Sequence, residues 1–307
     1  MSAVQGMLSC VKEAALPYDL EREIFEFAAF TDAQTILKLI LVAHRVKTWI
    51  EPLLSRIVSV TDPDRVKEPA SGRRITGETF LEMLDLRNGA SAGNHVRHIS
   101  IANITSTDEL ALARALSSCV HAVNVALFNI IEPHLFLRSI AKMPLQRLAA
   151  DLPLLFAGAN IDMNHSIFSR LTHLDLFDID VYAADSRWPQ RFSHIPFLTH
   201  ISFNFHPLGI PTQPVSSHRM LLSGILQDCK QLEVLVLICA EERLVKSISD
   251  KYPFFAEDTR SVILVVADFL QDWEAGASGG IDYWRRAEIG VRKRQLGQIS
   301  GSAYVVA

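Results

Sequence analysis

The feature that most constrains the fold of this chain is a six-residue pattern that recurs between residues 96 and 237. Each copy has an apolar residue, two variable residues, a second apolar residue, one variable residue and a third apolar residue. Apolar side chains at alternate positions are typical of a short β-strand that buries one face. The copies are Val96–Ile101, Ala122–Leu127, Leu145–Ala150, Leu171–Leu176, Leu198–Phe203 and Leu232–Leu237.

The spacing between copies predicts how the strands connect. Their middle apolar residues are separated by 26, 23, 26, 27 and 34 residues, which leaves room for a return helix between consecutive strands. Strands joined in this way run parallel, and such units bury their apolar faces by stacking on one another. We therefore expect an α/β fold, an irregular solenoid with a parallel sheet, in which Val262–Val266 adds a seventh strand. An ordinary doubly wound α/β domain stays open as the alternative, because the spacing is irregular.

The segment before the repeats has a different periodicity. From Leu16 to about Val60 the apolar residues recur at helical spacing. Residues 61–73 then interrupt this pattern, because Pro63 and Pro69 remove backbone donors and Gly72 resists a fixed conformation. We predict a helical module over residues 1–60, a linker over 61–73, and a repeat domain with a helical C-terminal cap over 74–307.

Composition excludes several classes of partner. The formal net charge of −4 gives no overall attraction to nucleic acid. No apolar run approaches the roughly 18 residues that span a bilayer, and no secretion signal opens the chain. The four cysteines are too far apart for a zinc ribbon or a redox motif. We expect a cytoplasmic or nuclear protein that has no cofactor, metal, nucleic-acid partner or membrane partner.

Two N-terminal segments resemble a known family. The segment Leu16-Pro17-Tyr18-Asp19-Leu20-Glu21-Arg22-Glu23-Ile24-Phe25 resembles the opening of an F-box, which has Leu-Pro, an acidic residue and an amphipathic helix. Val42–Trp49 resembles the Val-x-Lys/Arg-x-x-x-Trp segment of that family, although His44 replaces its common Cys or Ser. The repeat spacing brackets the period of about 20 to 29 residues of leucine-rich repeats. With its ending Trp273–Trp284, the whole chain is similar to expanded fungal F-box-like families.

The resemblance implies a non-enzymatic function. An F-box-like protein is a substrate-recruiting subunit of a cullin-RING ubiquitin ligase, which binds a Skp-type adaptor through its N-terminal helices and a protein cargo through its repeats. The residues at the apolar positions of the motif are the expected adaptor contacts: Leu16, Pro17, Ile24, Phe25, Val42, Val46 and Trp49. Two alternatives stay open. These residues form only the core of a helical cap, or the repeats are a protein-binding scaffold with no link to a ligase.

The repeat pattern also predicts a surface for the cargo. Side chains alternate along a strand, so the variable positions project from the face that the apolar positions do not use. The candidate cargo residues on this open face are Phe128, Asp151, His173, Asp175, Phe177, His200 and Asn204. His173 and His200 occupy equivalent positions in adjacent repeats, which places them about 5 Å apart with Asp175 on the same face. This spacing permits a pH-sensitive or metal-assisted contact; a solvated face that binds nothing is the alternative.

The search for catalytic motifs favours no enzyme. Gly89–Gly93 and Gly276–Gly280 both match the Gly-x-Ser-x-Gly pattern of hydrolases. The nucleophile of that pattern must stand on a turn from a strand to a helix, and neither segment has this context. Phosphate-binding glycine loops and the His-Glu-x-x-His motif do not occur. A serine hydrolase is therefore only a distant alternative.

A basic cluster lies near the C-terminus. We expect a solvated terminal helix here, with a nuclear-localisation signal or a phosphate-binding patch as the alternatives. The cluster comprises Arg285, Arg286, Arg292, Lys293 and Arg294.

Overall fold

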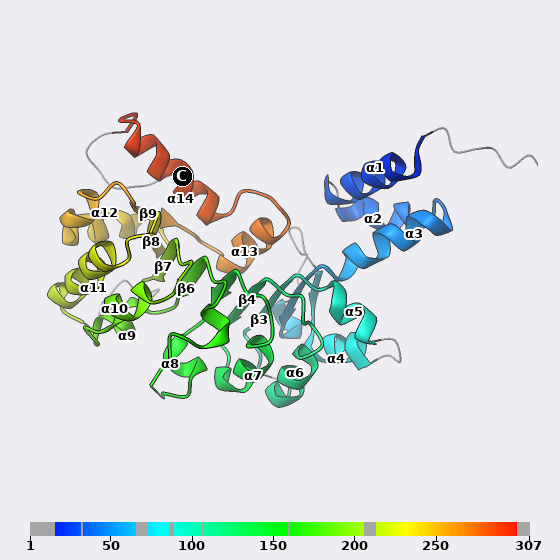
Figure 1. Cartoon of the computed structure of the whole chain (residues 1–307), viewed down its shortest axis with the longest axis horizontal. Coiled ribbons are helices and arrows are strands. Elements are labelled where there is room, and N and C mark those ends of the chain that lie inside the picture. The colour runs from blue at the N-terminus through cyan, green and yellow to red at the C-terminus, as the bar shows by residue number, and fades with distance from the viewer. Residues whose placement is uncertain are drawn as a thin grey trace, which may run out of the picture. The chain divides into compact units, whose positions relative to one another are not determined.

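A computed structural model describes residues 16–31, 33–65, 73–85, 89–105, 107–158, 160–205 and 213–299. The chain divides into two compact units, Met1–Leu54 and Ser55–Ala307 (Figure 1). The first unit is helical and the second contains the sheet, and each is described by itself. In the described residues, no helix combines the length and apolar character needed to cross a membrane.

The helical unit contains α1 (Tyr18–Thr31), α2 (Ala33–Leu39) and α3 (His44–Ile50), and the 3-10 turn Glu51–Ser55 follows them. Its core is built from Ala29 of α1 and from Val46, Trp49 and Ile50 of α3. The ring of Trp49 packs edge-on against Tyr18 at 4.8 Å, and its Nε1 donates a hydrogen bond of 3.2 Å to the Tyr18 hydroxyl. These contacts join the start of α1 to the end of α3.

The second unit is α/β and is built on a nine-stranded parallel sheet with the order β2-β1-β3-β4-β5-β6-β7-β8-β9. From β4 onward each described strand lies beside the one that precedes it in the chain. The sheet therefore lacks the central reversal of strand order that marks a doubly wound domain. The strands are β1 (Ile57–Thr61), β2 (Arg73–Ile75), β3 (His98–Ala102), β4 (Asn124–Phe128), β5 (Arg147–Ala149), β6 (His173–Leu176), β7 (His200–Asn204), β8 (Val234–Cys239) and β9 (Ser261–Val265).

The register confirms the repeat pattern. The six predicted strands are β3 to β8, and their middle apolar residues pair with one another across the sheet. The seventh predicted strand is β9, although it begins one residue earlier, at Ser261, which pairs with Leu235. The paired residues are Ile99, Val125, Leu148, Leu174, Ile201 and Leu235.

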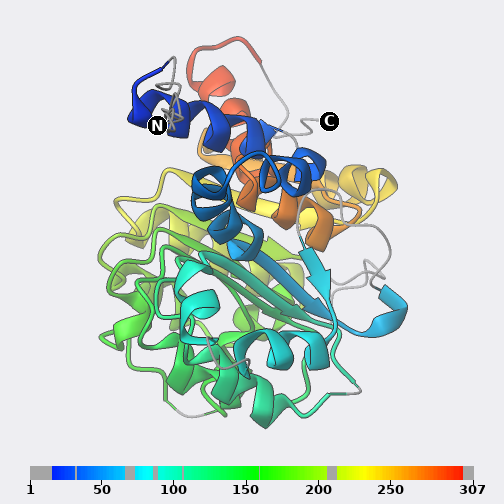
Figure 2. The same ribbon diagram turned by 90° about the vertical axis from the view of Figure 1, so that its right-hand side faces the viewer.

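One face of the sheet is covered by the return helices, which Figures 1 and 2 show on a single side. The apolar positions of the repeats project into this layer and are fully buried there. Asp108 and Asp151 begin α6 and α8, because each side chain accepts a backbone amide of the first helical turn. The helices are α4 (Gly77–Asp85), α5 (Gly89–His95), α6 (Glu109–Leu116), α7 (Leu137–Ile140), α8 (Leu152–Leu155), α9 (Ile179–Ala183), α10 (Trp188–Ser193), α11 (Val215–Asp228) and α12 (Glu242–Lys251).

The opposite face is covered by α13 (Phe269–Ala277) and α14 (Tyr283–Gln295), which are orange and red in Figure 1. Trp284 of α14 packs against the apolar side chains of β8 and β9, so both faces of these two strands are buried. Trp273 of α13 instead packs against Ala126 and Ala149 of β4 and β5. The C-terminal segment is thus a cover for much more of the sheet than its two last strands.

The predicted boundary between the two units is wrong. The helical unit ends at Leu54 rather than at residue 60, because Ile57–Thr61 is strand β1 of the sheet. The predicted linker over 61–73 also contains structure, since Pro63–Arg65 is a 3-10 turn and Arg73 begins β2. β-branched residues dominate Ile57–Thr61 and favour a strand, so this signal was present in the sequence.

Candidate functional site

The helical unit exposes an apolar surface. Leu16, Pro17, Ile24 and Val42, four of the expected adaptor contacts, are exposed. The other three are not: Val46 and Trp49 are buried in the unit's own core, and Phe25 packs against that core. The structure therefore corrects the expected exposure of Val46 and Trp49, because these two side chains of α3 pack in the core that holds α3 against α1.

Sequence reasoning missed two exposed residues on α1. Leu20, Ile24 and Phe27 are spaced by four and three residues, so they share one face of the helix. They are 48%, 54% and 73% exposed. We call these three residues the α1 stripe. The helical spacing of the α1 stripe can be predicted from the sequence, whereas the exposure of Phe27 cannot.

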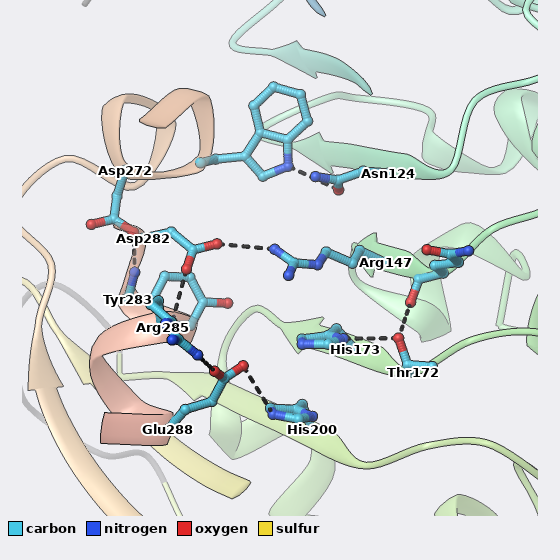
Figure 3. Close-up of polar contacts among 12 residues, drawn as sticks. Asn124, Arg147, Thr172, His173, His200, Asp272, Asp282, Tyr283, Arg285 and Glu288 are labelled. Atoms are coloured by element: carbon cyan, nitrogen blue, oxygen red, sulfur yellow. Dashed lines mark hydrogen bonds and ion pairs between the residues drawn. The ribbon is translucent and has the colours of Figure 1, made fainter. Parts of the chain in front are cut away.

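The sheet face that was expected to be open is covered, which corrects the predicted cargo surface. Asp175 and His200 are buried beneath α13 and α14. Trp273 Nε1 donates a hydrogen bond of 3.1 Å to Asn124 Oδ1, and Arg147 forms an ion pair of 3.0 Å with Asp282 (Figure 3). These two partners, on α13 and at the N-cap of α14, form hydrogen bonds with part of the buried polar face.

The remaining predicted cargo residues occupy different environments. Phe128 and Phe177 are half-buried and form an aromatic group with Phe269 of α13, with ring centroids 5.4 to 5.6 Å apart. Asp151 caps α8 by accepting the Leu154 amide at 2.9 Å. Asn204 is half-buried at the end of β7. The sheet therefore does not present these residues together as one exposed surface.

Asp175 sits at the centre of the covered face. Its carboxyl accepts a short hydrogen bond from the Ser202 hydroxyl, which also lies 3.3 Å from the hydroxyl of Tyr283 on α14. Burial raises the pKa of Asp175 to about 7, although the hydrogen bond from Ser202 opposes this rise. The network is closed to solvent and links β6, β7 and α14.

His173 and His200 lie side by side, which confirms their predicted proximity and the position of Asp175 on the same face. Their rings are stacked with centroids 4.1 Å apart and planes 12° from parallel. The edge of each packs against Trp284. Burial lowers the pKa of His173 to about 2 and that of His200 to about 4, so both rings are neutral at pH 7.

A carboxylate from α14 completes this cluster. Glu288 Oε1 lies 3.6 Å from His200 Nε2, and Glu288 Oε2 accepts a hydrogen bond of 2.8 Å from Arg285 (Figure 3). One nitrogen of each histidine and one oxygen of Glu288 lie within 4.8 Å of one another. Two imidazoles and a carboxylate at this spacing are the donor set of a cation site.

The two Gly-x-Ser-x-Gly segments lack the geometry of a nucleophile elbow. Gly89–Gly93 lies within helix α5, and Gly276–Gly280 extends from the end of α13. Neither serine therefore stands on a turn from a strand to a helix.

The basic cluster of α14 is largely occupied by contacts within the chain. Arg285 pairs with Glu288, and Arg286 pairs with Asp272 at 2.9 Å. Arg294 donates hydrogen bonds to the carbonyls of Ala256, Asp258 and Ser261. The contacts of Arg286 and Arg294 fix α14 to the rest of its unit.

No protein-family model, curated protein or solved structure matches this chain.

Proposed function

We propose that this chain is a non-enzymatic, F-box-like recruitment protein. Its helical unit binds a Skp-type adaptor of a cullin-RING ubiquitin ligase, and its leucine-rich-repeat-like sheet unit holds a protein cargo. The observation that carries the proposal is the α1 stripe, an apolar surface on a small helical unit that already has a core of its own. The resemblance of residues 16–25 and 42–49 to an F-box indicates which partner to expect, a Skp-type adaptor.

The geometry of the stripe suits a helix that lies in a groove of its partner. Such contacts use apolar anchors at helical spacing, as Leu20, Ile24 and Phe27 provide. Burying one large apolar side chain contributes about 1.5 to 3 kcal/mol before the costs of association. Val42 lies in the second F-box-like segment and is also exposed. These four side chains are the anchors of the proposed contact.

The core residues of the unit have a supporting role in this proposal. Val46 and Trp49 hold α3 against α1, and the ion pair between Arg45 and Glu21 does the same at the surface. Replacing Trp49 would therefore disturb the whole unit rather than remove one contact.

In this proposal the cargo binds the loops that follow the strands, because the sheet face that was expected to be open is covered. Asn103 and Asn129 directly follow β3 and β4, and Asp178 lies two residues after the end of β6. Each of the three has a positive φ between 51° and 61°. Asn129 also donates a hydrogen bond of 2.9 Å to Asn103, which aligns neighbouring loops. Loops held in this way by a rigid sheet are common places for recognition.

Substitutions in the stripe test the adaptor contact. We expect Ile24→Glu and Phe27→Glu each to lower co-purification of the full chain with a Skp-type adaptor at least tenfold, because a charge would enter an apolar interface. The matched control is Phe197→Glu, which places the same charge at a 58% exposed phenylalanine of the sheet unit. Circular dichroism establishes that the variants remain folded.

The pattern of results separates the two binding functions. Equal co-purification of wild type and both stripe variants would contradict the adaptor contact. If wild type retains other protein partners and binds no adaptor, the chain is a scaffold without a ligase.

A further inference from the structure

We infer that His173, His200 and Glu288 bind a divalent transition-metal cation of the zinc class between the sheet and α14. This site goes beyond the proposed adaptor and cargo contacts and does not depend on them. Its three donors come from β6, β7 and α14, and Figure 3 shows their side chains converging on one place.

The donor atoms match the preferences of Zn²⁺. Zinc binds imidazole nitrogen and carboxylate oxygen at about 2.0 to 2.2 Å, commonly with three protein ligands and one water. The three donors lie within 4.8 Å of one another. Binding requires the two nearly parallel rings to tilt toward each other and Glu288 to move in. Glu288 has the freedom to do so, because its side chain is 33% exposed.

Hydrogen bonds to threonine fix which nitrogen of each histidine faces the site. His173 Nδ1 lies 2.8 Å from Thr172 Oγ1, and that hydroxyl donates its own proton to the Gln146 carbonyl at 3.0 Å. Nδ1 must therefore be the donor, which leaves a lone pair on Nε2. A second partner that holds the ring in this way is a regular feature of metal-binding histidines.

The same arrangement recurs in the next strand. His200 Nδ1 lies 2.8 Å from Thr199 Oγ1, which donates to the Thr172 carbonyl at 3.3 Å. Two adjacent repeats therefore present the same imidazole atom toward α14. Repetition of the threonine and histidine pair makes both Nε2 atoms acceptors.

Neither Nε2 atom has a hydrogen-bond partner, and both are buried. The nearest carboxylate oxygen, Glu288 Oε1, lies 3.6 Å from His200 Nε2 and is also an acceptor. Three lone pairs thus face one another, which is unfavourable without a donor or a cation between them. A proton on His200 Nε2 would satisfy one pair only, and His173 Nε2 would still have no partner.

The surrounding charges leave the site open to a cation. Arg285 binds Glu288 Oε2 and so leaves Oε1 directed at the histidines. Arg147 is the other cation close to the pair, and it is neutralised by Asp282. A bound ion would join α14 to β6 and β7, and would stabilise the cover of the sheet face.

Metal titration of the full chain tests the site. We expect wild type that has been treated with a chelator to bind one Zn²⁺ per chain, as measured by calorimetry. Added Zn²⁺ should also raise the midpoint of its thermal unfolding. Co²⁺ in place of Zn²⁺ should give the visible absorption of a nitrogen and oxygen site. His200→Asn and Glu288→Gln should each weaken binding at least tenfold.

The variants are chosen to keep the fold. The amide of His200→Asn can still donate to Thr199 and offers nothing at the position of Nε2. The matched control is His121→Asn, which removes an exposed histidine and should leave the affinity unchanged. Absence of stoichiometric binding by wild type would overturn the inference whatever the variants do. Equal affinity in wild type and His200→Asn would also overturn it, and would assign any bound ion to another place.

Discussion

Individual side chains determine how each face of the sheet packs against the helices that cover it. Toward the return helices the strands present apolar side chains such as Ile99, Leu174 and Ile201. Toward α13 and α14 the same strands present polar side chains, of which Asp175 and His200 are buried. The first face is stabilised by the hydrophobic effect, whereas the second combines apolar contacts, as at β8 and β9, with individual hydrogen bonds and ion pairs. Substitutions on the second face should therefore have effects that depend on charge and pH.

His98, at the start of β3, tests this dependence. Burial lowers the pKa of His98 from 6.5 to about 4, and the nearby Arg56, Arg97 and Arg147 act in the same direction. Between these values the unfolded chain binds a proton at this residue and the folded chain does not. The free energy of unfolding therefore falls as the pH falls from about 6.5 to 4, by about 1.4 kcal/mol per pH unit from this residue.

We expect His98→Asn to remove that contribution. In urea unfolding at a series of pH values, the difference in stability between the variant and wild type should shift in favour of the variant as the pH is lowered through this interval. Every other titrating group is shared by the two proteins and cancels in the difference. A difference that stays constant with pH would contradict the burial of an uncharged His98.

Among the secondary-structure elements, the edge strand β2 is connected to a helix that is distant in the sequence. β2 has only three residues and pairs with β1 alone, at the edge of the sheet. Its Arg74 forms two hydrogen bonds of 2.8 Å with Glu274 of α13, whose carboxylate is completely buried. This ion pair connects the edge of the sheet to the C-terminal cover.

We expect Glu274→Gln to lower the free energy of unfolding by about 3 kcal/mol, because the substitution leaves Arg74 without its charged partner in a buried place. The matched control is Glu241→Gln, which breaks an ion pair with Arg243 between two exposed side chains. That change should leave the free energy of unfolding nearly unchanged, because an ion pair between exposed side chains contributes little. Urea unfolding measures both, and equal losses would show that the Arg74 pair is not buried in solution.

The elements themselves were unequally predictable. Strands β3 to β8 and their register follow from the repeat pattern, because its apolar positions all project into one layer. β1 was assigned to the helical module although its β-branched residues favour a strand, and β2 is too short to leave a periodic signal. Apolar periodicity therefore identifies the repeated strands and misses the irregular edge.

At the scale of the whole molecule, the sequence indicates two units and a C-terminal cap, but it does not indicate that the cap also covers the polar strands of the second sheet face. Polar side chains such as Arg147 and His200 are typical of a solvated face, so the pattern predicted an open surface. The partner of Arg147 is Asp282, which is 135 residues away. Local periodicity carries no information about a pair so far apart. For the same reason, the sequence does not indicate that Glu288, the third donor of the proposed metal site, lies beside the two histidines.

The helical unit showed the opposite limitation. Apolar periodicity predicts helices here, and most of these residues lie on α1, α2 or α3. Periodicity alone does not separate those in the core from those at the surface. Trp49 belongs to the core, and Phe27 is exposed. The proposed function rests on this division, because an adaptor can bind only the residues that the unit does not use for its own stability.

Hydrogen exchange of the full chain, with and without a purified Skp-type adaptor, tests the proposed function most directly. Slow exchange reports the backbone amides that binding protects. We predict that the adaptor protects amides of α1 and of the segment around Val42, and leaves β3 to β9 unchanged. An unchanged exchange pattern throughout the chain, or protection confined to the sheet unit, would contradict the proposal.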